Sequence, residues 1–296
     1  MSYLLILLLI LLYTMQSFFC KVYTDNYPGA PTATTPVFSV VSGLTTALVT
    51  LIFALFSLPF HFCWQVALLG IINGVVAAAY NASMIKASQR GPYSIQMVFM
   101  LSGGILLPAF VAFIYGDRLS LGQWISVAVI VVSIFLVSKK KGEKLGSGDL
   151  LFWVFCISLF IFNGAYGVLF DIQQNRWAAT AESKNEMIMF TFATSAFINA
   201  IMGFVQRKKQ FVTDFKQTRK SGIFLVLCSI ATALAINLLV FIMPLIDITV
   251  LYTFDNAGVL LFSVLCSFVF LKEKLWVTNI IGCVLMGAGL VGMVVL

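Results

Sequence analysis

Ten long apolar runs, separated by short polar segments, constrain the fold of this chain more than any other feature of its sequence. A helix needs roughly 20 apolar residues to cross the hydrocarbon core of a bilayer. The runs are continuously apolar and do not alternate, so helices are favoured over a β-barrel. The sequence therefore predicts an all-α membrane protein with ten transmembrane helices. The predicted spans are 2–20, 36–57, 64–85, 93–115, 121–138, 150–170, 186–206, 222–245, 248–271 and 276–296.

Composition places the chain far from soluble domains. Hydrophobic residues make up 61% and charged residues 10% of it, and its mean hydropathy is +1.03. Soluble domains carry about 25% charged residues. The first run lacks the basic segment and the small-x-small cleavage site of a signal peptide, so we expect 2–20 to be retained as a span. We expect the protein to be integral to the cell (cytoplasmic) membrane.

Patterns that would indicate catalysis or metal binding are missing from the sequence. The six cysteines lie in or at the ends of apolar runs without metal-ligand spacing, and His61 is the single histidine. No ATP-binding loop of the form GxxxxGK[ST] is present. We attribute the net charge of +7 to basic residues that anchor one membrane face. We therefore expect no enzyme activity, no catalytic residues, no cofactor, no metal and no nucleic-acid partner.

Basic residues are distributed unevenly between the loops on the two sides of the predicted spans. Lys and Arg near membrane spans stay in the cytoplasm, so the loops that carry them should be cytoplasmic and both termini should lie outside. We expect the basic segment 207–220 to be a solvated cytoplasmic loop near anionic lipid. Fifteen basic residues follow the odd spans: Lys21, Lys86, Arg90, Lys139, Lys140, Lys141, Lys144, Arg207, Lys208, Lys209, Lys216, Arg219, Lys220, Lys272 and Lys274. Three follow the even spans: Arg118, Arg176 and Lys184.

The two halves of the chain match each other in the register of their spans. Residues 69–139 fall on 225–295 without a gap, which places AlaAlaAlaTyrAsn from residue 77 opposite AlaLeuAlaIleAsn from residue 233. Identities are few, and accidental symmetry in a helical membrane protein is the alternative. Each half has five spans, so the second must enter the membrane upside down. We expect two five-helix repeats of inverted topology, 1–143 and 144–296, as in many secondary transporters.

Short motifs in both halves resemble one known family. The stretch LeuLeuProAlaPheValAlaPheIleTyrGlyAspArgLeuSerLeuGlyGlnTrp covers 106–124, and its counterpart is PheValPheLeuLysGluLysLeu at 268–275, followed by IleIleGlyCysValLeuMetGlyAlaGlyLeu at 280–290. With these motifs and its two-by-five pattern, the chain resembles a ten-helix, EamA-type member of the drug/metabolite transporter superfamily. The resemblance implies alternating access and a central cavity lined mainly by spans 1, 3, 4, 6, 8 and 9. Familiar members often have cytoplasmic termini, whereas the basic residues here place them outside.

Asp255 is the one charged residue that lies well inside an apolar run. An ionisable group at membrane depth is costly, and such residues usually serve a pathway or a bound partner. The carboxyl group could bind a proton or the amine of a substrate. Asp255 is therefore the leading candidate for a substrate-binding residue.

Further polar residues in the spans are candidates to line the same cavity. Several recur at helical spacing, so they share a face of their helix. The alternative is that buried amides only bond neighbouring helices, a contribution of about 0.6 kcal/mol each. The candidates are Asn256, Tyr252, Asn73, Tyr80, Asn81, Gln16, Asn163, Asn237, Gln96 and Ser102.

Small residues and a proline in the fourth span indicate a place where that helix bends. Gly103 and Gly104 lie near mid-membrane, and Pro108 follows one turn later. Such residues weaken or kink a helix. We expect a hinge here; close helix packing is the alternative.

The sequence predicts a secondary transporter that moves a small polar or amphipathic metabolite across the cytoplasmic membrane. Its partners would be the small-molecule substrate, membrane lipid and coupled protons. Because one chain holds both repeats, we expect a monomer. The alternative is a lipid-facing flippase, or a non-transporting membrane assembly partner, on the same scaffold.

Overall fold

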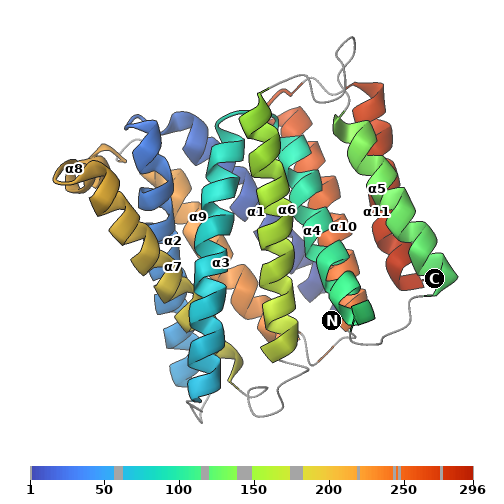
Figure 1. The fold of residues 1–296 in the computed structure, drawn as a ribbon, viewed down its shortest axis with the longest axis horizontal. Helices are drawn as coiled ribbons and strands as arrows, with labels where there is room; N and C mark the ends of the chain where they lie inside the picture. Colours follow the sequence, from blue (N-terminus) through green and yellow to red (C-terminus); the bar gives the residue numbers. More distant parts are fainter. Residues whose placement is uncertain are drawn as a thin grey trace.

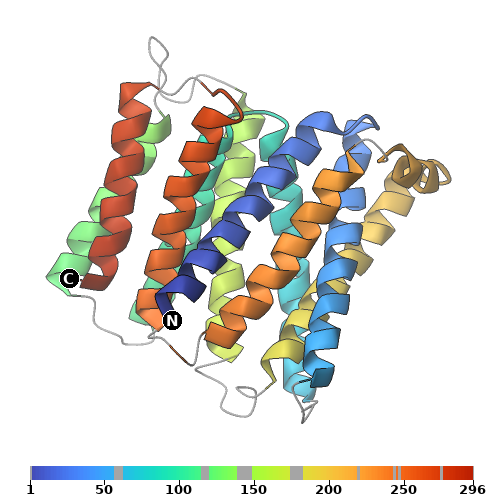
Figure 2. The same cartoon turned by 180° about the vertical axis from the view of Figure 1, so that it is seen from behind.

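The structure is a computed structural model that describes residues 2–56, 63–114, 120–138, 149–173, 183–218, 221–242, 245, 248–273 and 276–295. Over these residues the chain is all-helical, as predicted, and contains no strand. Figures 1 and 2 show a single bundle of roughly aligned helices. The helices are α1 (Ser2–Asn26), α2 (Pro31–Phe56), α3 (Trp64–Ser88), α4 (Tyr93–Ile114), α5 (Leu121–Ser138), α6 (Leu150–Asp171), α7 (Lys184–Arg207), α8 (Gln210–Gln217), α9 (Gly222–Ile242), α10 (Ile248–Val269) and α11 (Val277–Val295).

Six of these helices are long and apolar enough to cross a membrane: α1, α2, α3, α6, α7 and α9. Shorter apolar stretches are found in α4, α5, α10 and α11. The outer surface carries large apolar side chains; Phe56 is 85% and Leu121 79% exposed. A soluble protein rarely exposes so much contiguous apolar surface, whereas lipid tails cover it without cost. The expected class, a helical membrane protein, is supported at this level.

Most predicted spans agree with observed helices to within a few residues. Two helices are longer at one end than the apolar runs indicated. The first continues to Asn26 through an i,i+4 ion pair in which Lys21 Nζ lies 2.9 Å from Asp25 Oδ1. The second begins at Pro31, since proline is tolerated in the first turn of a helix, where its missing N–H has no partner to lose.

The prediction of a solvated loop over 207–220 is wrong, because α8 lies within it. One face of this short helix is buried against α7. Phe211 is 1% exposed, and its ring centroid is 5.1 Å from that of Phe204. The buried carboxylate of Asp214 accepts hydrogen bonds from Arg207 Nε (2.8 Å) and Nη2 (3.0 Å). The segment was not predicted as a helix because its few apolar residues are interspersed with basic and polar ones.

The packing of the bundle follows a regular pattern of helix pairs. The most extensive helix–helix contacts are those of α2 with α7 and of α5 with α11. In addition α3 packs on α6 and α7, α9 packs on α1 and α2, α4 packs on α6, and α10 packs on α1 and α11. The α5–α11 pair forms one edge of the bundle, and α7 with α8 lies toward the opposite edge (Figures 1 and 2). The helices α1, α3, α4, α6, α9 and α10 therefore surround the centre.

The two ends of the bundle differ in charge. The N- and C-termini lie at one end, here called the terminal end, and the turns α1–α2, α3–α4, α7–α8–α9 and α10–α11 lie at the other, the basic end (Figure 1). Among the basic residues that the structure describes, Lys184 is the one at the terminal end. The described residues of the basic end include Lys21, Lys86, Arg90, Arg207, Lys208, Lys209, Lys216 and Lys272. The other basic residues, Lys139, Lys140, Lys141, Lys144, Arg219, Lys220, Lys274, Arg118 and Arg176, lie outside the described residues.

Candidate functional site

A cavity of about 160 Å³ lies in the centre of the bundle. A cavity needs about 10–15 Å³ of such volume for each water, so this one holds roughly ten waters or one small solute. Side chains from eight helices line it: Tyr13, Gln16 and Ser17 of α1; Phe38 and Ser42 of α2; Ala77, Tyr80 and Asn81 of α3; Met100, Leu101 and Gly104 of α4; Asn163, Tyr166, Gly167 and Phe170 of α6; Phe192 of α7; Thr232, Ile236 and Leu239 of α9; and Asp255, Asn256 and Val259 of α10.

Several of the residues predicted from sequence meet at this cavity. They come from both halves of the chain, on α1, α3, α4, α6 and α10. The sixth helix that the family resemblance implied, α9, lines the cavity through Thr232, Ile236 and Leu239, which were not predicted. Helices α2 and α7 also contribute, through Phe38, Ser42 and Phe192. Those three lie in apolar or hydroxyl-rich stretches that gave no signal. The predicted residues that line the cavity are Gln16, Tyr80, Asn81, Gly104, Asn163, Asp255 and Asn256.

Asp255 is the charged residue of the cavity wall. Its side chain is 7% exposed, and its Oδ1 has no hydrogen-bond partner among the described residues. No Lys, Arg or His is found among the residues that line the cavity in the described part of the chain. A buried polar group without a partner is costly, and a buried charge is more so. The carboxyl group is therefore a vacant acceptor or proton site in the cavity wall.

Gly104 leaves space for two amides that approach the cavity from other helices. A Cβ at this position would lie 2.7 Å from Asn163 Nδ2 and 3.7 Å from Asn256 Oδ1. Asn163 Nδ2 also donates to Met100 O (2.7 Å), which ties α6 to α4. This glycine therefore sets the shape of the cavity wall.

Gly103, its neighbour, faces a different environment. A Cβ there would lie 2.0 Å from the backbone oxygen of Phe160, and one on Gly164 would lie 2.5 Å from Gly103 O. The backbones of α4 and α6 thus cross in close contact, as small residues allow in membranes. Pro108 lies within α4, and its Cγ is 3.4 Å from the position of a Cβ on Gly167. The geometry explains the glycines by packing; a hinge at Gly103, Gly104 and Pro108 stays a prediction.

Aromatic rings form much of the rest of the wall. They belong to Tyr13, Phe38, Tyr80, Tyr166, Phe170 and Phe192. Tyr80 Oη donates to Met100 Sδ (3.0 Å), and the rings of Tyr166 and Phe170 pack edge to face with centroids 5.0 Å apart. The cavity therefore combines apolar faces with a few polar groups, the usual composition of a small-molecule site.

Four other predicted residues lie outside the cavity lining, and two of them, Asn237 and Gln96, bond one helix to another. Asn237 Nδ2 donates to Thr50 Oγ1 (3.0 Å), which joins α9 to α2. Gln96 Nε2 donates to Met84 O (3.3 Å), and its Oε1 accepts from Ser88 Oγ (2.7 Å). Ser102 Oγ donates to Val98 O (2.5 Å). Asn73 is fully buried away from the cavity, and neither of its amide atoms has a partner among the described residues.

One predicted residue and one motif cannot be placed. The side chain of Tyr252 lies outside the described residues, and so does GlyAspArgLeu at 116–119.

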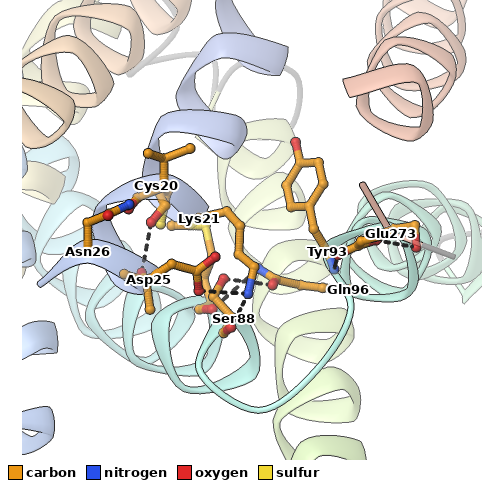
Figure 3. A network of polar contacts seen from close by, with 12 residues as sticks. Cys20, Lys21, Asp25, Asn26, Ser88, Tyr93, Gln96 and Glu273 are labelled. Carbon is orange, nitrogen blue, oxygen red and sulfur yellow. Dashed lines mark hydrogen bonds and ion pairs between the residues drawn. The ribbon is translucent and has the colours of Figure 1, made fainter. Parts of the chain in front are cut away.

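Polar contacts close the cavity from the basic end. Tyr93, fully buried at the start of α4, donates from Oη to Ser263 Oγ (3.2 Å) and shares a hydrogen bond with Ser17 Oγ (2.6 Å). Lys21 Nζ donates to Ser88 O (2.5 Å) and so ties α1 to the end of α3 (Figure 3). These contacts join α1, α3, α4 and α10 above the cavity.

Glu273, in the turn between α10 and α11, caps α4 from the other half of the chain. Its Oε1 accepts from Tyr93 N (2.6 Å), and its Oε2 accepts from Ser94 N (3.2 Å) and Ser94 Oγ (3.0 Å) (Figure 3). Ser267 Oγ donates to the same carboxylate. A carboxylate at a helix N-terminus satisfies free N–H groups and interacts well with the helix dipole. Neither Tyr93 nor Glu273 stands out in the sequence as a functional candidate, because Tyr93 begins an apolar run and Glu273 lies in a charged turn.

An exposed ion pair also lies on the surface of the basic end, away from the cavity lining. Arg90 Nη1 lies 2.5 Å from Asp149 Oδ2, and Asp149 Oδ1 caps α6 at Leu151 N. The hydrogen bond from Arg90 holds the pKa of Asp149 below its usual range. The contribution of this pair to stability is therefore present above the ordinary pKa of an aspartate and is lost as the pH falls through the lowered value.

The cavity is placed asymmetrically between the two ends. On α4 the first residue of the lining, Met100, lies seven residues after Tyr93, which is about 10 Å along the helix at 1.5 Å per residue. Toward the terminal end the lining continues to Phe170, one residue before the end of α6. On α6 the cavity lining thus reaches the terminal end, while the contacts of Tyr93 lie between the lining of α4 and the basic end.

Comparison with known proteins supports the fold alone. No protein-family model matches the chain, and no curated protein does. A solved structure described only as "Crystal structure of protein" aligns with 98% of this chain and 95% of that chain. Its TM-score is 0.55 and its sequence identity 16%. The chain therefore shares a helical arrangement with that structure along nearly its whole length.

Proposed function

We propose that this protein is a secondary transporter that carries a small polar or amphipathic metabolite across the cell membrane. The observation that carries the proposal is the central cavity, in whose wall Asp255 Oδ1 has no hydrogen-bond partner among the described residues, and whose lining reaches toward the terminal end. Transporters bind solute near the bilayer midplane and expose the site to each side in turn. The resemblance of the chain to EamA-type transporters agrees with this function.

The helix packing supports an organisation into two inverted repeats. We pair α1–α5 of residues 1–143 with α6, α7, α9, α10 and α11 of residues 144–296. Exchanging the halves converts α3–α7 into α9–α2, α4–α6 into α10–α1, and α3–α6 into α9–α1, while α2–α7 and α5–α11 map onto themselves. All of these pairs pack together. An approximate twofold axis through the cavity would account for this correspondence.

The uneven charge supports one orientation in the membrane. With the basic end in the cytoplasm, both termini lie outside, and the cavity in this structure extends outward. The contacts of Tyr93, Lys21 and Glu273 then form the closed cytoplasmic gate. Transport requires these contacts to open while the terminal end closes.

Uptake by reconstituted protein tests the proposal. Purified protein in proteoliposomes is given a panel of labelled metabolites, with and without a pH gradient, and protein-free liposomes are the control. Uptake of at least one solute above the control is expected, and a dependence on the gradient would indicate coupled protons. Uptake equal to the control across the panel contradicts transport. Scrambling of labelled lipid without solute uptake would favour the flippase, and neither activity would favour an assembly partner.

A further inference from the structure

We propose that the transported solute is a small organic cation, whose ammonium group is held between Asp255 and the aromatic rings of the cavity. This inference rests on the proposed transport function and names its substrate class.

The charge of the cavity wall is the first argument. Among the described residues that line the cavity, Asp255 is the one ordinarily charged at neutral pH, and its Oδ1 has no hydrogen-bond partner there. A carboxylate in a low-dielectric site needs a positive partner. An anionic solute would place a second negative charge beside it, which disfavours that class.

Two basic side chains on helices that line the cavity, Lys21 of α1 and Lys86 of α3, are engaged elsewhere. Lys21 Nζ bonds Asp25 Oδ1 (2.9 Å) and Ser88 O (2.5 Å) at the basic end. Lys86 Nζ lies 5.3 Å from the ring centroid of Phe155, and neither lysine lines the cavity. Within the described chain, a positive charge for Asp255 must therefore come from the solute or from a proton.

Aromatic rings are the second argument, because they attract cations through their faces. Tyr13, Phe38, Tyr80, Tyr166, Phe170 and Phe192 bring six rings from five helices to one cavity. A cation within about 6 Å of a ring centroid is stabilised most when it has been removed from water. Rings and a single carboxylate together recognise an alkylated ammonium, which has few hydrogen-bond donors to satisfy.

The remaining polar groups and the volume limit the rest of the solute. The side-chain amides of Gln16 and Asn81 line the cavity. They can bind a hydroxyl or carbonyl group of the solute. A volume of about 160 Å³ suits a compact molecule with a handful of heavy atoms and excludes large polycyclic cations. The expected substrates are small hydroxylated or acylated ammonium compounds.

A pair of probes that differ in charge but not in shape tests the inference. Choline and its neutral carbon isostere 3,3-dimethyl-1-butanol are compared as competitors for labelled choline bound to the purified wild-type protein. We expect the isostere to compete about tenfold more weakly or worse, a difference of about 1.4 kcal/mol. Tetramethylammonium should compete, and 3,3-dimethylbutyrate should not. Equal competition by choline and the isostere, or no choline binding at millimolar concentration, overturns the inference without any variant.

Variants locate the effect. Asp255→Asn should lose choline affinity by tenfold or more and abolish the preference for charge, whereas Asp255→Glu should retain the preference. Asp149→Asn is the matched control, because it makes the same change at an exposed helix cap outside the cavity, where Asn caps as well as Asp. If the Asp255→Asn protein keeps the wild-type preference, Asp255 is not the binding group and the inference fails. If the panel shows uptake of neutral solutes alone, transport stands and the cation is refuted; if no solute moves, both proposals fail.

Discussion

At the scale of single residues, position on the helix decides which polar groups can act on a solute. Asn81 and Asn237 occupy matching places in the two halves, yet Asn81 lines the cavity and Asn237 bonds Thr50 on another helix. Sequence could select the residue types, since polar groups in apolar spans are few. Sequence could not distinguish cavity lining from bonding between helices, because a small rotation of a helix about its axis changes which neighbour a side chain contacts.

Replacing Asp255 removes the cavity's charge with little change in volume. We expect Asp255→Asn to be inserted and folded, judged by a single symmetric peak in size-exclusion chromatography, and to lose at least about tenfold of wild-type uptake. The measurement is initial uptake rate in proteoliposomes. If a folded Asp255→Asn protein transports at the wild-type rate, Asp255 has only a structural role.

Gly103 and Gly104 are adjacent, and the same substitution should affect them differently. Gly103→Ala places a Cβ 2.0 Å from a backbone oxygen of α6, so the helices must separate and the thermal midpoint should fall. Gly104→Ala displaces the Asn163 amide, a flexible side chain, so the fold should persist while solute affinity falls. Melting curves and binding isotherms of both variants provide the check. A slowed turnover with unchanged binding and stability would instead favour the hinge.

At the scale of elements, ten of the helices could be located from the sequence because each lies in a continuous apolar run, although six of them are long and apolar enough to cross a membrane. Helix α8 could not, since its buried face rests on Phe211, Asp214 and Phe215 among basic residues. The cap of α4 by Glu273 could not be found either. Tyr93 and Ser94, whose N–H groups it caps, lie 180 and 179 positions before Glu273 in the chain, and no local pattern predicts such a contact.

Weakening the cap on α4 should open the basic end more often. Glu273→Gln keeps the size of the side chain but loses its charge-assisted bonds to Tyr93 N and Ser94 N. In a background without native cysteines, Ala77→Cys reports access to the cavity. We expect a thiol reagent applied from the basic end to label it several-fold faster in the Glu273→Gln protein. Lys272→Gln is the control, and equal labelling in all three proteins would show that Glu273 does not gate access.

The ion pair between Arg207 and Asp214 holds α8 against α7. Asp214→Ala leaves the guanidinium of Arg207 without its partner and removes a buried acceptor, so we expect the free energy of unfolding to fall. Chemical denaturation in detergent measures it. The double variant Arg207→Leu with Asp214→Ala should recover part of the loss; if it does not, the buried face and not the charge pair stabilises α8.

At the scale of the whole molecule, the charge difference between the ends makes a prediction about orientation. A cysteine at Lys209, in the turn before α8, should resist an impermeant thiol reagent in intact cells once the native cysteines are replaced. A cysteine at Ser2, at the terminal end, should react. Labelling in the reverse order would show that the basic end faces outward.

Both termini lie at the same end of the bundle, and this has a consequence for how the chain could be made. A linker that joined them would not have to cross the bilayer. The gene could then be circularly permuted to begin at residue 144, so that the ribosome delivers the second half first and the first half second. Each half carries five long helices, so either order leaves every long helix in its own direction. The order in which the two halves are synthesised could therefore be reversed without changing the architecture that they build.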